Sequence, residues 1–167
     1  LVVGLCGITL AVGGAWLIAL RGSWFYLVAG AAMLACGVQL ARRRASALWI
    51  FAALVLGTLL WALWEAGLDW WPLAARGDVL FLIGLFLLTP WIGRRLDAAS
   101  PSSMSGTPSA ALKAGRAALT VALGLFLAVG IVSWFVDPHK IEGVVSDAGP
   151  APAPGSRVAE SEWTAYG

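Results

Sequence analysis

Five apolar runs, each nearly free of charged residues, determine what this chain can fold into. An α-helix needs roughly 17–25 apolar residues to cross a bilayer core, and each run has about that length. The runs cover about residues 1–20, 24–41, 47–64, 77–93 and 117–136. Only 12% of all residues are charged, whereas a soluble domain carries about 25%. The sequence therefore predicts an all-α integral membrane bundle of five transmembrane helices.

Basic residues are concentrated in the two loops that follow the second and fourth runs. They are Arg42, Arg43, Arg44, Arg94, Arg95, Lys113 and Arg116. Loops that stay in the cytoplasm are rich in Lys and Arg, so these two loops are expected inside. Eight of the nine carboxylates, all except Asp97, fall on the opposite side. The pattern predicts a cytoplasmic N-terminus and an exported tail after Val136.

The first run could instead belong to a signal peptide. A signal peptide has a basic region before its apolar stretch and a small-residue cleavage site before polar sequence. Neither pattern is evident here, and the turn at Arg21-Gly22-Ser23 leads directly into the second apolar run. A pair of helices joined by this turn is therefore expected.

Small residues recur at four-residue spacing in three of the runs. The pairs are Ala31 and Ala35, Ala53 and Gly57, and Gly124 and Ala128. This spacing allows helices to approach closely in lipid, and it favours a compact bundle.

Residues that commonly hold metals or act as nucleophiles are scarce. Cys6 and Cys36 lie within apolar runs and are expected to be small buried hydrophobic residues. His139 is the single histidine, and no cysteine or histidine spacing resembles that of a metal site. The net charge of +2 gives no indication of nucleic-acid binding. No catalytic residue and no metal site is predicted in this chain.

The stretch from Trp61 to Asp78 differs from an ordinary membrane loop. It contains the tryptophans Trp61, Trp64, Trp70 and Trp71, the carboxylates Glu65, Asp69 and Asp78, and the basic residue Arg76. Tryptophan favours the depth at which the bilayer core gives way to water, because its ring is apolar and its N–H needs a polar partner. Trp61, Trp64 and Glu65 are spaced i, i+3 and i+4, so they are expected on one helix face.

Two interpretations of this stretch remain open. In the first, it only anchors two helices: Asp78 caps the fourth helix, and Glu65 and Asp69 pair with Arg76. In the second, it receives an amphiphilic ligand such as a quinone headgroup. The Trp70–Trp71 pair then covers the ring, Arg76 donates to a carbonyl oxygen, and one of the three carboxylates exchanges protons. Carboxylates near membrane depth are costly and often mark proton or substrate paths.

The segment after the last run contains alternating prolines, a pattern that favours an extended spacer. Residues 137–160 are therefore interpreted as an exported linker, and a spacer outside the membrane implies an attached domain. Only the short segment 161–167 follows it. The chain also starts at Leu1 without an initiator methionine. The sequence is interpreted as a fragment of a longer protein.

Several stretches resemble one known family. They are Gly13-Gly14, Gly22–Leu27, Arg42–Arg44 with Ala47–Trp49, Trp61–Leu73, Arg76–Asp78 and Trp163–Gly167. The family comprises the membrane-bound dehydrogenases that use pyrroloquinoline quinone (PQQ) to oxidise glucose, quinate and related polyols. Its members carry an N-terminal anchor of five helices and then a large periplasmic β-propeller, and residues 161–167 are similar to the start of that propeller. The resemblance covers nearly the whole chain.

The resemblance implies the membrane anchor of a quinoprotein dehydrogenase in the bacterial inner membrane. Electrons would pass to ubiquinone, which the 61–78 stretch would help to bind, and the tail would hold the periplasmic propeller. PQQ, calcium and the catalytic base of the family belong to that propeller, so this chain alone is not expected to oxidise sugars. Two other classes are a stand-alone scaffold or assembly factor, and a transporter, which would show more polar residues or broken helices at mid-membrane.

Overall fold

The computed structural model describes residues 2–97 and 109–136, which form six helices. The helices are α1 (Val2–Ala19), α2 (Phe25–Ala41), α3 (Ser46–Ala66), α4 (Trp70–Leu87), α5 (Pro90–Asp97) and α6 (Ala110–Trp134). The predicted all-α class is therefore confirmed for this part of the chain. The expected linker 137–160, the closing segment 161–167 and Leu1 lie outside the described residues, as does most of the connection between α5 and α6.

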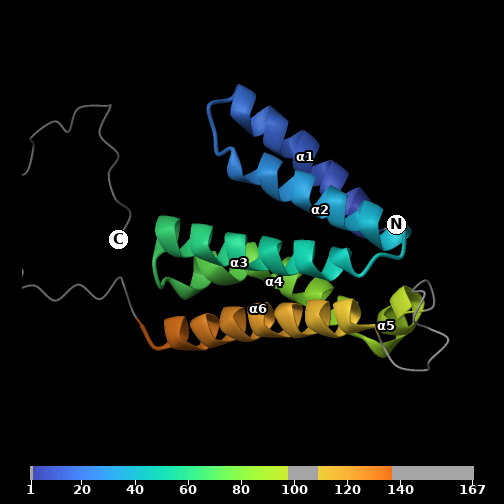
Figure 1. Ribbon diagram of the computed structural model, residues 1–167. Helices are drawn as coiled ribbons and strands as arrows, with labels where there is room; N and C mark the ends of the chain where they lie inside the picture. Colours follow the sequence, from blue (N-terminus) through green and yellow to red (C-terminus); the bar gives the residue numbers. More distant parts are fainter. Residues whose placement is uncertain (1, 98–108, 137–167) are drawn as a thin grey trace, which may run out of the picture.

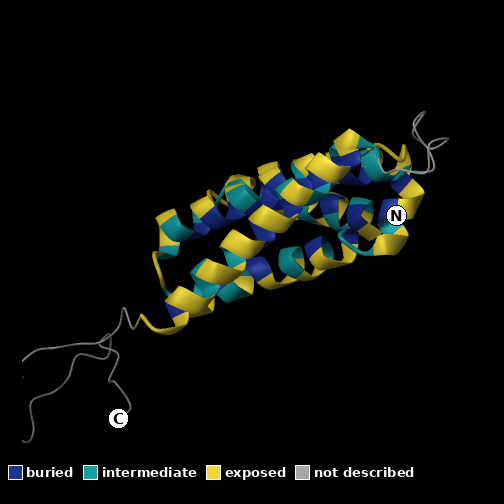
Figure 2. Ribbon diagram, turned by 60° about the horizontal axis from the view of Figure 1, so that its bottom comes forward, coloured by how far each residue is buried: buried dark blue, intermediate teal, exposed yellow. Residues whose placement is uncertain are grey.

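Four of these helices, α1, α3, α4 and α6, are long and apolar enough to cross a membrane, and α2 is a shorter apolar helix of 17 residues. Figure 2 shows exposed residues along the outer faces of the helices. Many of them are large and apolar, including Val12, Leu60, Leu82 and Val121, each more than half exposed. A surface with so many exposed apolar side chains requires a solvent other than water, and a bilayer core supplies it.

The helices form two groups, and α2 and α3 connect them. The antiparallel pair α1–α2 forms one group, and α3, α4 and α6 form the other (Figure 1). The core lies mainly around α3, where Leu48, Phe51 and Val55 are at most 1% exposed. In Figure 1 the α1–α2 pair lies closest to the second group at the end where the chain passes from α2 to α3.

Glycines allow the backbones of α1 and α2 to touch. A Cβ atom at Gly14 would overlap the backbone of Leu27, and one at Gly30 would overlap the backbone of Ala11. Gly7 and Gly37 meet the opposite backbone in the same way. Since these neighbours are backbone atoms and cannot rotate away, a larger residue would force the two helices apart. The four glycines are spaced by seven residues within each helix, about two turns.

The small residues at four-residue spacing do not have this role. All six of them, from Ala31 to Ala128, are exposed on the outside of the bundle. A Cβ atom at Gly57 or Gly124 would meet no atom within 4 Å. The expectation that these pairs bring helices together within the bundle was therefore wrong. In a chain so rich in Ala and Gly, four-residue spacing of small residues occurs on outer faces as well as on contact faces.

Helix α4 begins at Trp70, about two turns before the expected start of the fourth span near residue 77. Its N-cap is Asp69, whose Oδ1 accepts a hydrogen bond from the backbone N–H of Trp71 at 3.2 Å. Pro72 fits in the first turn because the N–H that it lacks would have no partner there. Asp78 therefore lies inside the helix, and the interpretation of Asp78 as its cap was wrong.

The apolar run that was expected to continue to about residue 93 is divided at Pro90. Helix α4 ends at Leu87, and the short helix α5, which the sequence analysis did not predict, follows it. Arg116 of α6 connects the two elements, because its Nη2 donates to the carbonyl oxygen of Leu88 at 2.8 Å. Helix α6 begins at Ala110, earlier than the expected 117, because the hydroxyl of Ser109 caps it.

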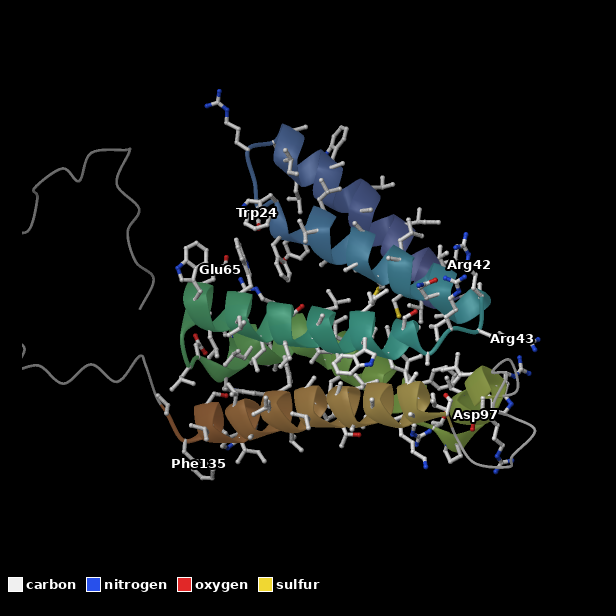
Figure 3. All side chains as sticks on the ribbon, viewed as in Figure 1. Trp24, Arg42, Arg43, Glu65, Asp97 and Phe135 are labelled. Atoms are coloured by element: carbon white, nitrogen blue, oxygen red, sulfur yellow. The ribbon has the colours of Figure 1, made fainter. Side chains whose placement is uncertain are left out.

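The two ends of the bundle differ in chemistry. Figure 3 places Arg42, Arg43 and Asp97 at one end, which we call the arginine end. Trp24, Glu65 and Phe135 lie at the opposite end, the tryptophan end. The two loops that are rich in arginine thus lie on the same side of the bundle. Which side of the membrane each end faces stays a prediction.

Both cysteines are free thiols. Cys36 is completely buried, and its Sγ donates to the carbonyl oxygen of Ala47 at 3.4 Å, so it contributes to the contact between α2 and α3. Cys6 is only partly buried. The expectation of a small buried hydrophobic residue is therefore confirmed for Cys36 and holds in part for Cys6.

Candidate functional site

The ring of Trp61 is the centre of an aromatic cluster at the tryptophan end. Its centroid lies 4.9 Å from that of Trp24, 5.2 Å from that of Phe25 and 5.0 Å from that of Trp64. Phe25 is stacked on it, and the other two rings meet it edge to face. The cluster thus joins the start of α2 to the end of α3, where the two helix groups would otherwise be apart.

A polar network lies beside this cluster. Trp61 Nε1 donates to Glu65 Oε2 at 3.0 Å, and Arg76 Nη2 lies 3.1 Å from the same oxygen. The predicted common face of Trp61 and Glu65 and the predicted pairing of Glu65 with Arg76 are therefore both confirmed. Gly67 makes this pairing possible, since its φ of 62° ends α3 and lets the chain reverse direction into α4.

A partly open cavity of about 350 Å³ lies between the α1–α2 pair and helices α3 and α4. We call it the inner cavity. Most of its wall is apolar, and its polar lining residues are Thr9, Tyr26, Thr58, Arg76 and Asp78. Ligand pockets for small molecules typically combine such an apolar wall with a few placed polar groups.

Two polar atoms of residues that line this cavity are buried without a hydrogen-bond partner among the described residues. They are Thr58 Oγ1 and Arg76 Nη1. Thr58 is only 2% exposed, and Arg76 uses its other terminal nitrogen for Glu65. A buried donor without a partner costs about 1–3 kcal/mol, so such atoms normally have a protein, water or ligand partner. Thr58 and Arg76 thus place two buried donors without partners in the wall of the inner cavity.

Asp78 lies between two hollows. It lines the inner cavity and also a groove of about 450 Å³ between α4 and α6, which we call the outer groove. Its Oδ1 accepts from the backbone N–H of Val79 at 2.6 Å. Asp78 lies eight residues after the start of α4, about 12 Å along the helix axis. A carboxylate at this depth in a membrane helix is a costly feature.

The outer groove differs from the inner cavity because aromatic and aliphatic side chains form nearly all of its lining. Trp70 and Trp134 stand at its tryptophan end with their ring centroids 4.5 Å apart, and Trp71 lies 5.7 Å from Trp70. Phe126 and Leu73 line its floor. This groove has the character of a surface that faces lipid chains.

The eight predicted site residues do not converge on one point. Trp61, Glu65 and Arg76 come together, and Arg76 and Asp78 reach the inner cavity. Trp70 lies instead against Trp134 of α6, and Trp71 is exposed beside Trp70. Asp69 caps α4, and the Trp64 side chain is three-quarters exposed.

Sequence reasoning missed the contribution of the other helices. Phe25 and Tyr26 line the inner cavity from α2, and Thr58 lines it from α3. The aromatic run Trp24-Phe25-Tyr26 at the start of the second span was a signal that could have been used. Thr58 gave less indication, because a single threonine in an apolar helix usually bonds to its own backbone.

Comparison with known proteins gives several related sequences. The chain is 41% identical over 166 residues to the quinoprotein glucose dehydrogenase of Escherichia coli (strain K12), covering 98% of this chain and 19% of that protein. It is 38% identical over 170 residues to quinoprotein glucose dehydrogenase A of Acinetobacter calcoaceticus, covering 100% and 19%. It is 36% identical over 172 residues to the probable quinate dehydrogenase (quinone) of Xanthomonas campestris pv. juglandis, covering 100% and 20%.

The chain thus spans about a fifth of the length of the curated relatives that it matches. No protein-family model matches it. No solved structure matches it significantly.

Proposed function

We propose that this chain anchors the periplasmic catalytic domain of a membrane-bound quinoprotein dehydrogenase. The chain is homologous over its whole length to the N-terminal portion of membrane-bound quinoprotein glucose and quinate dehydrogenases. The apolar outer surface and the four candidate spans support this role. In this proposal the membrane is the bacterial inner membrane. The parent protein would oxidise glucose or a similar polyol.

The orientation follows from the two chemically different ends. The arginine end faces the cytoplasm, because cytoplasmic loops are enriched in Lys and Arg. The tryptophan end then faces the periplasm, with its rings at the membrane interface. Helix α6 ends there, so a domain attached after Val136 would lie on the periplasmic side (Figure 3).

PQQ and calcium are assigned to that further domain. Among residues 2–97 and 109–136, no three His, Cys, Asp or Glu side chains gather into a group that could hold a metal ion. These residues therefore do not fit a calcium-bound cofactor, and no step in this chain is assigned to PQQ or calcium.

We further propose that the inner cavity receives the headgroup of ubiquinone. The observation that carries this proposal is the pair of unpartnered donors, Thr58 Oγ1 and Arg76 Nη1, in a cavity with apolar walls. Quinone carbonyl oxygens are acceptors without donors of their own, so they complement these two atoms. The name of the Xanthomonas relative also specifies a quinone.

Each polar residue then has a separate task. Arg76 donates from Nη1 to one carbonyl oxygen while Glu65 holds its Nη2. Thr58 donates a second hydrogen bond from α3. A quinone takes up two electrons and two protons when it is reduced to the quinol, and the carboxyl group of Asp78 offers one route for a proton from the tryptophan end.

The test uses the full-length parent enzyme in membranes, with ubiquinone and a soluble dye as alternative electron acceptors. Thr58→Val keeps the size of the side chain and removes the hydroxyl, so the KM for ubiquinone should rise by about two- to tenfold. Activity with the dye should stay unchanged. Equal losses with both acceptors, or an unchanged KM for ubiquinone, would contradict a headgroup in the inner cavity.

Thr9→Val is the matched control. Thr9 lines the same cavity, but its Oγ1 already donates to the carbonyl oxygen of Cys6 at 2.9 Å within α1. Its replacement should leave the KM for ubiquinone unchanged.

A further inference from the structure

A second amphiphilic hollow lies at the arginine end, on the opposite side of the bundle from the tryptophan cluster. It has a volume of about 450 Å³, and we call it the arginine-end groove. Helices α1 and α2 line it with Val2, Val3, Leu40 and Ala41, and the turn after α2 adds Arg43. Helices α4 and α5 complete the lining with Phe86, Leu87, Trp91, Ile92, Arg95 and Leu96. The groove therefore separates the α1–α2 pair from the end of α4 and from α5.

The lining of this groove is divided between apolar and cationic side chains. Its apolar lining includes the buried Leu87, Leu96 and Val3 and the half-exposed rings of Phe86 and Trp91. The charged side chains are Arg43, in the turn between α2 and α3, and Arg95 of α5. The guanidinium of Arg95 lies 4.3 Å from the centroid of the Trp91 ring.

Within residues 2–97 and 109–136, no carboxylate forms an ion pair with the two arginines of the groove. Among the described residues, Asp97 is the carboxylate at this end, and its Oδ1 accepts from the backbone N–H of Ser109 at 3.0 Å. The ion pair between described residues, Glu65 with Arg76, lies at the other end. Arg43 and Arg95 thus stand beside an apolar groove without an anionic partner in the described part of the chain.

We propose that the arginine-end groove binds one phospholipid with an anionic headgroup. The phosphate lies between Arg43 and Arg95, and an acyl chain lies against Val2, Leu40 and Phe86. Basic pockets between membrane helices recognise anionic lipid headgroups in this manner. A neutral lipid would leave the charge unpaired, and an inorganic anion would leave the apolar wall uncovered, so a ligand with both properties fits best. This inference requires a membrane but does not rest on the quinone proposal.

The backbone conformation of Arg43 allows its charge to be removed without strain in the turn. Its φ is 52°, in the left-handed region that glycine adopts without strain. Arg43→Gly therefore removes the guanidinium and leaves a turn that is at least as stable. Arg21 at the tryptophan end has a similar φ of 61°. Arg21→Gly removes one positive charge with the same backbone effect, and it is the matched control.

A second pair of variants lies on α5. Arg95→Gln removes the charge that lines the groove. Arg94→Gln removes the neighbouring charge on the same helix, which does not line this groove. The two variants change the net charge of the arginine end equally, so they separate a specific site from a general attraction between arginines and acidic lipids.

The experiment measures lipid binding to the full chain, purified in a detergent with a neutral headgroup, by native mass spectrometry. Dioleoylphosphatidylglycerol is the test lipid, dioleoylphosphatidylcholine the neutral lipid, and glycerol 1-phosphate the headgroup without chains. We expect one tightly bound phosphatidylglycerol, weaker phosphatidylcholine, and no retained glycerol phosphate. Arg43→Gly and Arg95→Gln should each weaken phosphatidylglycerol binding by about fivefold, and Arg21→Gly and Arg94→Gln should not.

Three results would overturn the proposal. Equal binding of the two lipids would show that charge does not select the occupant. Equal effects of Arg94→Gln and Arg95→Gln would show that the attraction is general. Retention of glycerol phosphate with unchanged lipid binding in Arg43→Gly would show an anion site without a lipid groove.

Discussion

Glu65 and Arg76 pair across the turn between α3 and α4, with Arg76 Nη2 3.1 Å from Glu65 Oε2. The same oxygen accepts the Nε1 hydrogen of Trp61 at 3.0 Å. One carboxylate oxygen therefore fixes both the central ring of the aromatic cluster and the direction of the guanidinium. The second terminal nitrogen of Arg76 is buried beside the inner cavity, and no described residue bonds to it.

The first prediction concerns this pair. Glu65→Gln in the full-length enzyme keeps the shape of the side chain but weakens its hold on Arg76. Because the pair is partly exposed, the free energy of unfolding should fall by less than about 1 kcal/mol. The KM for ubiquinone should rise by about two- to fivefold, since Arg76 is less well oriented. Steady-state rates with ubiquinone and with a soluble dye measure the difference.

Trp64 provides the control for Glu65. Their spacing in the sequence placed the two residues on the same helix face, in the stretch expected to help bind ubiquinone. In the structure, the Trp64 side chain is three-quarters exposed and does not line the inner cavity. Trp64→Phe should therefore leave the KM for ubiquinone unchanged. If Trp64→Phe raised the KM for ubiquinone more than Glu65→Gln, the headgroup would lie against the exposed ring of Trp64 instead of in the inner cavity.

The second prediction concerns the glycine contacts between α1 and α2. Gly14→Ala places a methyl group against the backbone of Leu27, and the helices must separate to accept it. Overpacking of this kind costs about 1–3 kcal/mol. At the adjacent Gly13, a Cβ atom would meet nothing within 4 Å, so Gly13→Ala should be neutral or stabilise the helix by up to about 1 kcal/mol.

Thermal unfolding of the two variants in detergent compares these expectations directly. The chemical change is the same, and the two positions are neighbours in one helix. A similar midpoint for both variants would mean that the backbones of α1 and α2 are not in contact in solution.

The third prediction concerns orientation. Leu68→Cys places a thiol in the exposed turn before α4 at the tryptophan end, and Arg44→Cys places one in the turn between α2 and α3. A maleimide that cannot cross membranes should label Leu68→Cys in intact cells. It should label Arg44→Cys only after the membrane has been permeabilised. The opposite pattern would reverse the assignment of the two ends, and the parent sequence with Cys6 and Cys36 gives the background.

The sequence predicted the helices well because the apolar runs are long and the turn signals are clear. Arg21-Gly22-Ser23 and Arg42–Arg44 separate α1, α2 and α3 within a few residues of the expected positions. The start of α4 was placed too late, since charged and aromatic residues made 70–78 resemble a loop. The decisive local signal was Asp69, followed by a proline in the first helical turn.

The candidate site was harder to predict for a different reason. Spacing along one helix correctly joined Trp61 to Glu65, because these residues are one turn apart. Thr58 and Tyr26 reach the inner cavity from different helices. Their convergence depends on how the α1–α2 pair tilts against α3, and no local pattern encodes that angle. For the same reason, the exposed Ala31 and Ala35 were mistaken for contact residues.

The glycine contacts also bear on how the protein is made. Helix α1 packs mainly against α2, and these two helices are consecutive in the chain. Contacts between adjacent elements form early because little chain entropy is lost in closing them. The α1–α2 pair can therefore assemble before the later helices dock on it. During biosynthesis, the face of α2 that α1 does not cover is then available for the later helices to pack against.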